Sequence, residues 1–198
     1  YRWSRFVQAH PWPMAIGGTL ALIALALPVF SLRLGFSDEG NFAEDTSARQ
    51  AYDLLAEGFG PGHNGPILIV AQLPEGTDLA TLEAVTAAVG ADPGVAFASP
   101  AVPNDPAAPT AALWQVIPTS APQDEATYDL VDRLRDDVLP GAIEGSGIET
   151  YVTGNVAVAV DFSDYLAARL PLFFAAVLAL SFLLLMAVFR SVLVPLKA

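Results

Sequence analysis

The chain has 198 residues, of which 54% are hydrophobic, yet its formal net charge is −12. A single water-soluble globular domain rarely has both properties, unless the apolar and the charged residues lie in different parts of the chain. The excess of acidic residues argues against nucleic-acid binding. The chain has no cysteine, which excludes a disulfide framework, a cysteine nucleophile and a thiolate metal site.

The apolar and the charged residues are separated along the chain. Residues 12–32 form one apolar stretch, residues 170–189 form a second that is uncharged throughout, and all 21 acidic residues lie between Asp38 and Asp164. A helix of about 20 residues spans the ~30 Å hydrocarbon core of a bilayer. We therefore expect two transmembrane helices on either side of an acidic segment.

Basic residues predict the orientation of these two helices. Arg2 and Arg5 precede the first stretch, and Arg190 and Lys197 follow the second. Because cytoplasmic flanks are enriched in Lys and Arg, we expect residues 1–11 and 190–198 to be cytoplasmic and residues 33–169 to be mostly extracytoplasmic. Two alternatives are less favoured. A cleaved signal peptide would have a shorter apolar stretch and a small-residue cleavage site, and a buried core helix is rarely so long and so apolar.

The acidic segment contains alternating helix and strand patterns. Apolar periodicity and capping residues predict helices near 47–58, 78–89 and 124–139, and short apolar runs predict strands near 66–73, 94–98, 112–118 and 148–152. The proline-rich residues 99–110 are expected to form an exposed connection. The strand–helix–strand, strand–helix–strand order is that of a ferredoxin-like (split βαβ, βαββαβ) domain over residues 33–154, so the fold class is an α+β membrane protein. Helical residues 155–169 then lead into the second span.

A glycine motif precedes the first predicted strand. Gly60, Gly62 and Gly65 have the G-x-G-x-x-G spacing of a dinucleotide-binding loop. That loop needs a strand before it and a helix after it, whereas here the predicted order is reversed. Pro61 and Pro66 also remove backbone donors. We therefore interpret the three glycines as a structural corner and expect no nucleotide cofactor.

Few residues of the acidic segment suggest chemistry. His63 has no neighbouring ligand or nucleophile in the sequence, so neither a catalytic site nor a metal site is expected, and no cofactor. Asp161 and Asp164 are three residues apart and share a helix face. One interpretation is that they are paired catalytic or ion-binding carboxylates. The favoured interpretation is that they are charges at the outer membrane interface, where Arg169 would also lie. Asp161, Asp164, Arg169 and Arg190 are the candidate coupling or interface positions.

Three stretches of the chain are distinctive: residues 51–66, residues 152–164 and the ending FRSVLVPLKA, residues 189–198. Together they resemble the MMPL family of membrane transporters, which belongs to the resistance-nodulation-division (RND) superfamily. The resemblance implies one span, its extracytoplasmic porter domain and the next span, taken from a longer polypeptide in a bacterial inner (plasma) membrane. The Asp-Tyr proton relays of the family lie on a later span, so no relay residue is assigned here.

The resemblance further implies a proton-motive-force-driven exporter of lipids or other hydrophobic molecules, with the porter domain in the substrate path, and no enzymatic activity. Expected partners are membrane lipids, the missing spans of the same polypeptide, a hydrophobic substrate and, as one option, further copies in a homo-oligomer. The main alternative is a two-span sensor or assembly factor whose extracytoplasmic domain binds a partner. An extracytoplasmic enzyme that depends on His63 or Asp161 is a more distant alternative.

Overall fold

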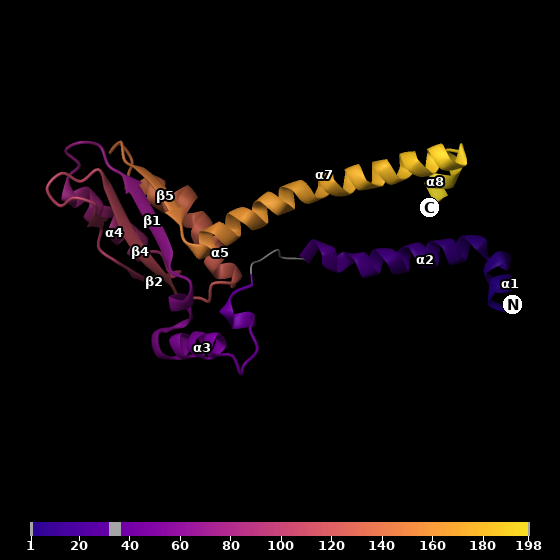
Figure 1. The fold of residues 1–198 in the computed structure, drawn as a ribbon, viewed down its shortest axis with the longest axis horizontal. Helices are drawn as coiled ribbons and strands as arrows, with labels where there is room; N and C mark the ends of the chain where they lie inside the picture. Colours follow the sequence, from indigo (N-terminus) through magenta and orange to yellow (C-terminus); the bar gives the residue numbers. More distant parts are fainter. Residues whose placement is uncertain (1, 32–36, 198) are drawn as a thin grey trace. The chain divides into compact units, whose positions relative to one another are not determined.

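The computed structural model describes residues 2–31 and 37–197. The expected end of the first span at residue 32 and the expected start of the domain at residue 33 lie outside the described residues, as do residues 1 and 198. Contacts divide the chain into two compact units, Tyr1–Leu34 and Gly35–Ala198, and each unit is described by itself (Figure 1).

The first unit is helical. It contains α1 (Arg2–Ala9), α2 (Pro11–Ala26) and the 3₁₀ segment η1 (Leu27–Ser31). Pro11 suits the first turn of α2, where its missing N–H is not needed, whereas Pro28 disfavours continuation of the α-helix past Ala26. The apolar stretch therefore changes from α-helix to 3₁₀ helix before its end. Pro11–Val29 is long and apolar enough to be a candidate membrane span, and none of the described side chains of α2 is buried.

The second unit is built on an antiparallel sheet. Its strands are β1 (Ile67–Gln72), β2 (Val95–Ala98), β3 (Val102–Pro103), β4 (Ala111–Pro118) and β5 (Glu149–Thr153). They lie in the order β2-β4-β1-β5, with β3 also paired to β4, and every described pair is antiparallel. The strand β3 falls within residues 99–110, which the sequence indicated as a plain connection. Pro103 is compatible with a strand there because β3 is a short edge strand.

Helices cover one face of this sheet. They are α4 (Leu79–Gly90), α5 (Glu125–Arg133) and the start of α7 (Asn155–Phe189) (Figure 1). Alternate strand residues such as Ile67, Ile69 and Trp114 are fully buried and form one core with Val85 of α4 and Leu130 of α5. The indole N–H of Trp114 donates to the Thr86 hydroxyl at 2.9 Å, which satisfies the one polar atom of that side chain. On the opposite sheet face Leu113 and Tyr151 are exposed.

The helix that follows β4 is longer than the sequence pattern indicated. After α5, a π-helical turn η4 (Leu134–Val138) leads into α6 (Leu139–Ala142), so the helical segment passes Pro140 instead of ending near residue 139. A proline inside a helix lacks its N–H and crowds the preceding turn. A π turn directly before it widens the helix, and the Leu139 N–H bonds to the Leu134 carbonyl. Arg135 lies within this turn.

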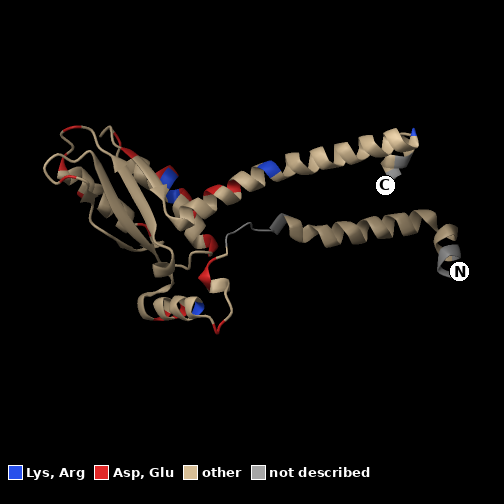
Figure 2. Ribbon diagram, viewed as in Figure 1, with Lys and Arg blue, Asp and Glu red and all other residues tan. Residues whose placement is uncertain are grey.

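The longest helix, α7, has 35 residues and is about 52 Å long at 1.5 Å per residue. Its buried residues are confined to the N-terminal part that packs on the sheet domain: Val156, Ala157, Ala159, Val160 and Ser163. Beyond Arg169 the helix is apolar and mostly exposed, without a charged residue up to Phe189 (Figure 2). Arg190 ends α7 in the left-handed region, φ 46°, and α8 (Leu193–Lys197) follows.

Candidate functional site

The three glycines of the G-x-G-x-x-G motif form the corner between α3 (Ser47–Phe59) and β1, through the 3₁₀ turn η3 (Pro61–Asn64). Gly60 has a φ of +100°. A Cβ on Gly62 would lie 1.8 Å from the Pro118 carbonyl oxygen, and a Cβ on Gly65 would lie 2.6 Å from the Pro122 side chain. Each glycine is therefore required by local packing or backbone conformation, and a helix precedes the loop where a nucleotide loop would have a strand.

His63 lies on the surface of this corner. Its ring is exposed and 5.7 Å from the Phe59 ring. Among the described residues, no group of three His, Cys, Asp or Glu side chains is placed to hold a metal ion.

Beside the buried apolar residues of α7, Arg135 makes a polar contact between the sheet domain and α7. Its guanidinium donates to both carboxylate oxygens of Asp161 on α7, at 2.6 and 3.1 Å, and to the backbone carbonyl of Val152 on β5 at 3.2 Å. The Arg135 side chain is 27% exposed and that of Asp161 is 60% exposed. Bidentate arginine–carboxylate pairing fixes orientation as well as distance. We call Arg135, Asp161 and the Val152 carbonyl the α7 clamp, since they connect η4, β5 and α7.

Asp164 lies one helical turn further along α7 and is exposed. Burial and then the Asp164 charge raise the pKa of the Asp132 carboxyl of α5, while Arg135 opposes that shift. The two carboxylates of the predicted pair thus have different partners. Asp161 forms an ion pair with Arg135, whereas Asp164 is close enough to Asp132 to repel it.

The two arginines of the predicted set lie apart from the clamp. The Arg169 guanidinium lies over the Tyr165 ring, 5.1 Å from its centroid, on the same face of α7. Arg190 is exposed at the C-terminal end of α7. The sequence analysis assigned no role to Arg135, which is one of two arginines in the charged stretch 132–137.

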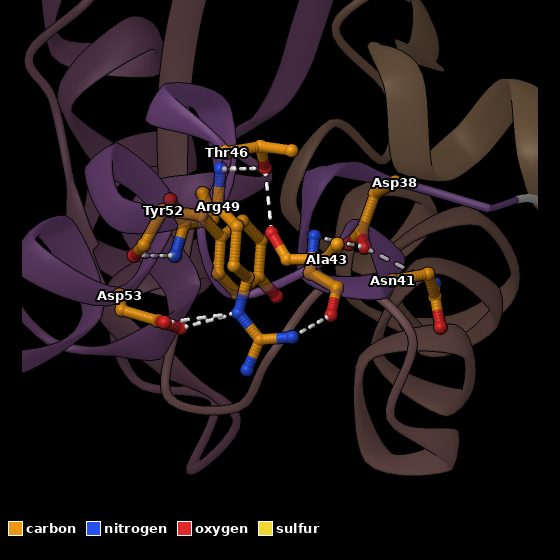
Figure 3. A network of polar contacts seen from close by, with 9 residues as sticks. Asp38, Asn41, Ala43, Thr46, Arg49, Tyr52 and Asp53 are labelled. Carbon is orange, nitrogen blue, oxygen red and sulfur yellow. Dashed lines mark hydrogen bonds and ion pairs between the residues drawn. The ribbon is translucent and has the colours of Figure 1, made fainter.

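A cavity of about 280 Å³ lies between the start of α7 and the segment that precedes α3. Its lining combines polar side chains with an apolar wall that includes Val156 and Pro122. Beside it, Asp38 caps the turn η2 (Glu39–Asn41), and Arg49 of α3 pairs with Asp53 and also donates to the Gly40 carbonyl (Figure 3). Burial and then the Asp38 carboxylate raise the pKa of the Tyr52 hydroxyl.

The structure combines an antiparallel sheet, covered by helices on one face, with two long apolar helices that are mostly not covered by protein. This combination defines an α+β membrane protein. A sequence model of the MMPL family matches residues 45–197. The chain belongs to the MMPL family, and it is a membrane protein.

Individual relatives are similar over 99% of the chain. It is 40% identical to the membrane protein YdfJ of Bacillus subtilis and 31% identical to the mycolic acid-containing lipids exporter MmpL11 of Mycolicibacterium smegmatis. It is 26% identical to the heme uptake protein MmpL11 of Mycobacterium tuberculosis. The chain spans 26%, 21% and 20% of the lengths of these three proteins.

Proposed function

We propose that this chain is one span, the porter domain and the next span of an RND/MMPL-type transporter that is driven by the proton-motive force. It exports lipids or other hydrophobic molecules and makes or breaks no bonds. Family membership and the similarity to a lipids exporter support this proposal. Neither span carries a charged residue in its apolar core, so the proton relay is assigned to the rest of the polypeptide.

We further propose that residues 33–154 are a ferredoxin-like porter domain on the extracytoplasmic side of a bacterial inner membrane, with residues 1–11 and 190–198 in the cytoplasm. The strand order β2-β4-β1-β5 supports this fold, since α4 connects β1 to β2 and the α5 segment connects β4 to β5, as in a split βαβ unit. The basic residues that flank the two apolar stretches support the orientation.

The observation that carries the mechanism is the continuity of α7. One helix begins in the packed core of the domain and continues without a break through a span-length apolar segment. A rigid helix that belongs to both regions transmits a displacement of the membrane part to the domain, and the α7 clamp fixes the domain to it. Asp161 is thus proposed as a coupling residue. Alternating access by domains that rock about the membrane is the general mechanism of such transporters.

This function can be tested before the substrate is identified. The gene is deleted from the source bacterium, and the lipids and other hydrophobic molecules are compared inside the cell and on its exterior. Export predicts that at least one molecule is lost from the exterior and accumulates inside, that the gene restores it, and that a protonophore prevents the restoration. Depletion inside the cell would indicate import, and unchanged inventories would contradict transport.

A further inference from the structure

The uncharged part of α7 is bounded by two arginines. Residues 170–189 carry no charge and lie between Arg169 and Arg190 (Figure 2). At 1.5 Å per residue this segment is about 30 Å long, which is the thickness of the hydrocarbon core of a bilayer. The buried residues of α7 and both of its aspartates come before Arg169. Arg169 therefore lies at the level of the lipid headgroups, on the side of the membrane where the sheet domain lies.

Arg169 differs from the arginines of the sheet domain in its partner. Each of those that the structure describes forms an ion pair with an aspartate, namely Arg49 with Asp53, Arg133 with Asp92 and Arg135 with Asp161. Arg169 lies against the ring of Tyr165, and no carboxylate of the described residues pairs with it. Asp164, five residues earlier, is about 140° around the helix from Arg169. The Arg169 charge is thus available to an anion that is not part of this chain.

Tyr165 holds the Arg169 guanidinium in position. The two residues are four apart and share a helix face, and the guanidinium carbon lies 5.1 Å from the centre of the Tyr165 ring. Because Tyr165 precedes Arg169, this contact directs the guanidinium away from the apolar segment and towards the sheet domain. A guanidinium has five N–H donors, and the exposed Tyr165 side chain adds a hydroxyl. Donors from both side chains can therefore reach one anion.

The anion that surrounds a membrane helix at this depth is the phosphate of phospholipid headgroups, and a guanidinium binds phosphate oxygens in a bidentate manner. We propose that Tyr165 and Arg169 form a binding site for the phosphate of a phospholipid in the leaflet next to the sheet domain. The bound lipid fixes the depth of α7 in the membrane. Lipid binding is measured without transport, so the proposal is independent of the proposed function.

The experiment measures lipid binding beside Arg169 with a tryptophan reporter in the full chain. Leu172→Trp places the reporter at an exposed position three residues past Arg169. Trp3 and Trp12 are replaced by Phe, and the remaining Trp114 is buried in the sheet domain. The chain is reconstituted in vesicles of brominated phosphatidylcholine, which quenches the reporter. A lipid without bromine restores the fluorescence when it displaces the brominated lipid. Phosphatidylcholine is compared in this way with digalactosyldiacylglycerol, which has no phosphate.

The proposal predicts that phosphatidylcholine binds beside the reporter about two- to fivefold more tightly than the galactolipid, the size expected of an exposed ion pair. Arg169→Gln should remove this preference, and Tyr165→Leu should reduce it, because the guanidinium is then no longer held. Both side chains are exposed, so neither replacement removes a core contact. Arg190→Gln is the matched control. It removes the same charge about 27 Å from the reporter and should leave the preference unchanged.

Any one of three results would overturn the proposal: equal binding of the two lipids when Tyr165 and Arg169 are intact, an undiminished preference in Arg169→Gln, or the same loss in Arg169→Gln and Arg190→Gln. A second arm separates the lipid from free phosphate. Inorganic phosphate is added at constant ionic strength. An unchanged preference assigns the site to the lipid, as proposed, whereas its loss would assign the site to the free ion and contradict the proposal.

Discussion

At the residue scale, close contacts impose sharp requirements on single positions. Gly62 lies directly against the backbone of Pro118, so the end of β4 and the η3 corner can approach only where there is no side chain. Asp92, in the connection between α4 and β2, is held by Arg133 of α5 at 2.9 and 3.1 Å and also accepts from the Gly94 N–H. These two contacts tie the ends of the sheet to its helices.

Gly62→Ala should destabilise the sheet domain, because its Cβ would overlap the Pro118 carbonyl oxygen and force the corner away from β4. The expected cost is about 1–3 kcal/mol or more, as for other overpacked sites. Gly58→Ala is the matched control. It lies in α3 with no atom near the added Cβ, and it should be neutral or stabilising by up to about 1 kcal/mol. The midpoints of thermal unfolding of both variants are measured by tryptophan fluorescence, to which the buried Trp114 contributes. Equal midpoints for the two variants would refute the packing argument.

The Asp92–Arg133 pair should make the stability of the domain depend on pH. The hydrogen bond from Arg133 lowers the pKa of Asp92 below its ordinary value of 3.8. Because the pKa of Asp92 is lower in the folded state, the ion pair contributes fully to the free energy of unfolding above pH 3.8. This contribution is lost as the pH falls through the folded-state pKa. Asp92→Asn should cost about 1–2 kcal/mol at neutral pH, since Arg133 is partly exposed.

Unfolding curves of wild type and Asp92→Asn, recorded from neutral pH to below pH 3.8, test this account. The difference in the free energy of unfolding between wild type and Asp92→Asn should become smaller as the solution becomes more acidic. A difference that stays constant over the whole range would mean that the ion pair is not its cause.

At the element scale, α7 connects the domain to the membrane. Pro171 lies within it and already removes one backbone hydrogen bond, so a second interruption nearby should break its continuity. Ala175→Pro should therefore abolish transport at unchanged abundance, whereas Ala175→Leu, which fits an apolar helix, should not. Export from cells, normalised to the amount of protein in the membrane, is the measurement. Normal export by Ala175→Pro would contradict coupling through α7.

Local patterns in the sequence predict most of these elements. The apolar β-branched run before Gln72 predicts a strand, and capping at Asp78 predicts the start of α4. The two-residue strand β3 carries too short a pattern to be predicted, and the helix past Pro140 depends on a π turn that no propensity signals. Arg135 and Asp161 are 26 residues apart, so their pairing follows from the packing of the α5 segment against α7. The cavity depends on such packing too, and sequence reasoning did not find it.

At the scale of the whole molecule, the chain spans about a quarter of the length of YdfJ. The proposed orientation can be tested with single cysteines, because this segment contains none. A membrane-impermeant maleimide should label Glu75→Cys in intact cells and Val192→Cys only after lysis, since both residues are exposed and lie on opposite sides of the proposed membrane. Labelling of both positions in intact cells would disprove the orientation.

The central claim is that the domain and α7 move as one body during transport, and exchange of the clamp charges tests it most directly. Export is measured for Arg135→Asp, for Asp161→Arg and for the double variant. The account predicts that each single variant loses most export at normal abundance, because like charges then face each other across the contact, and that the double variant recovers a substantial part of it. Full export by both single variants would contradict the claim.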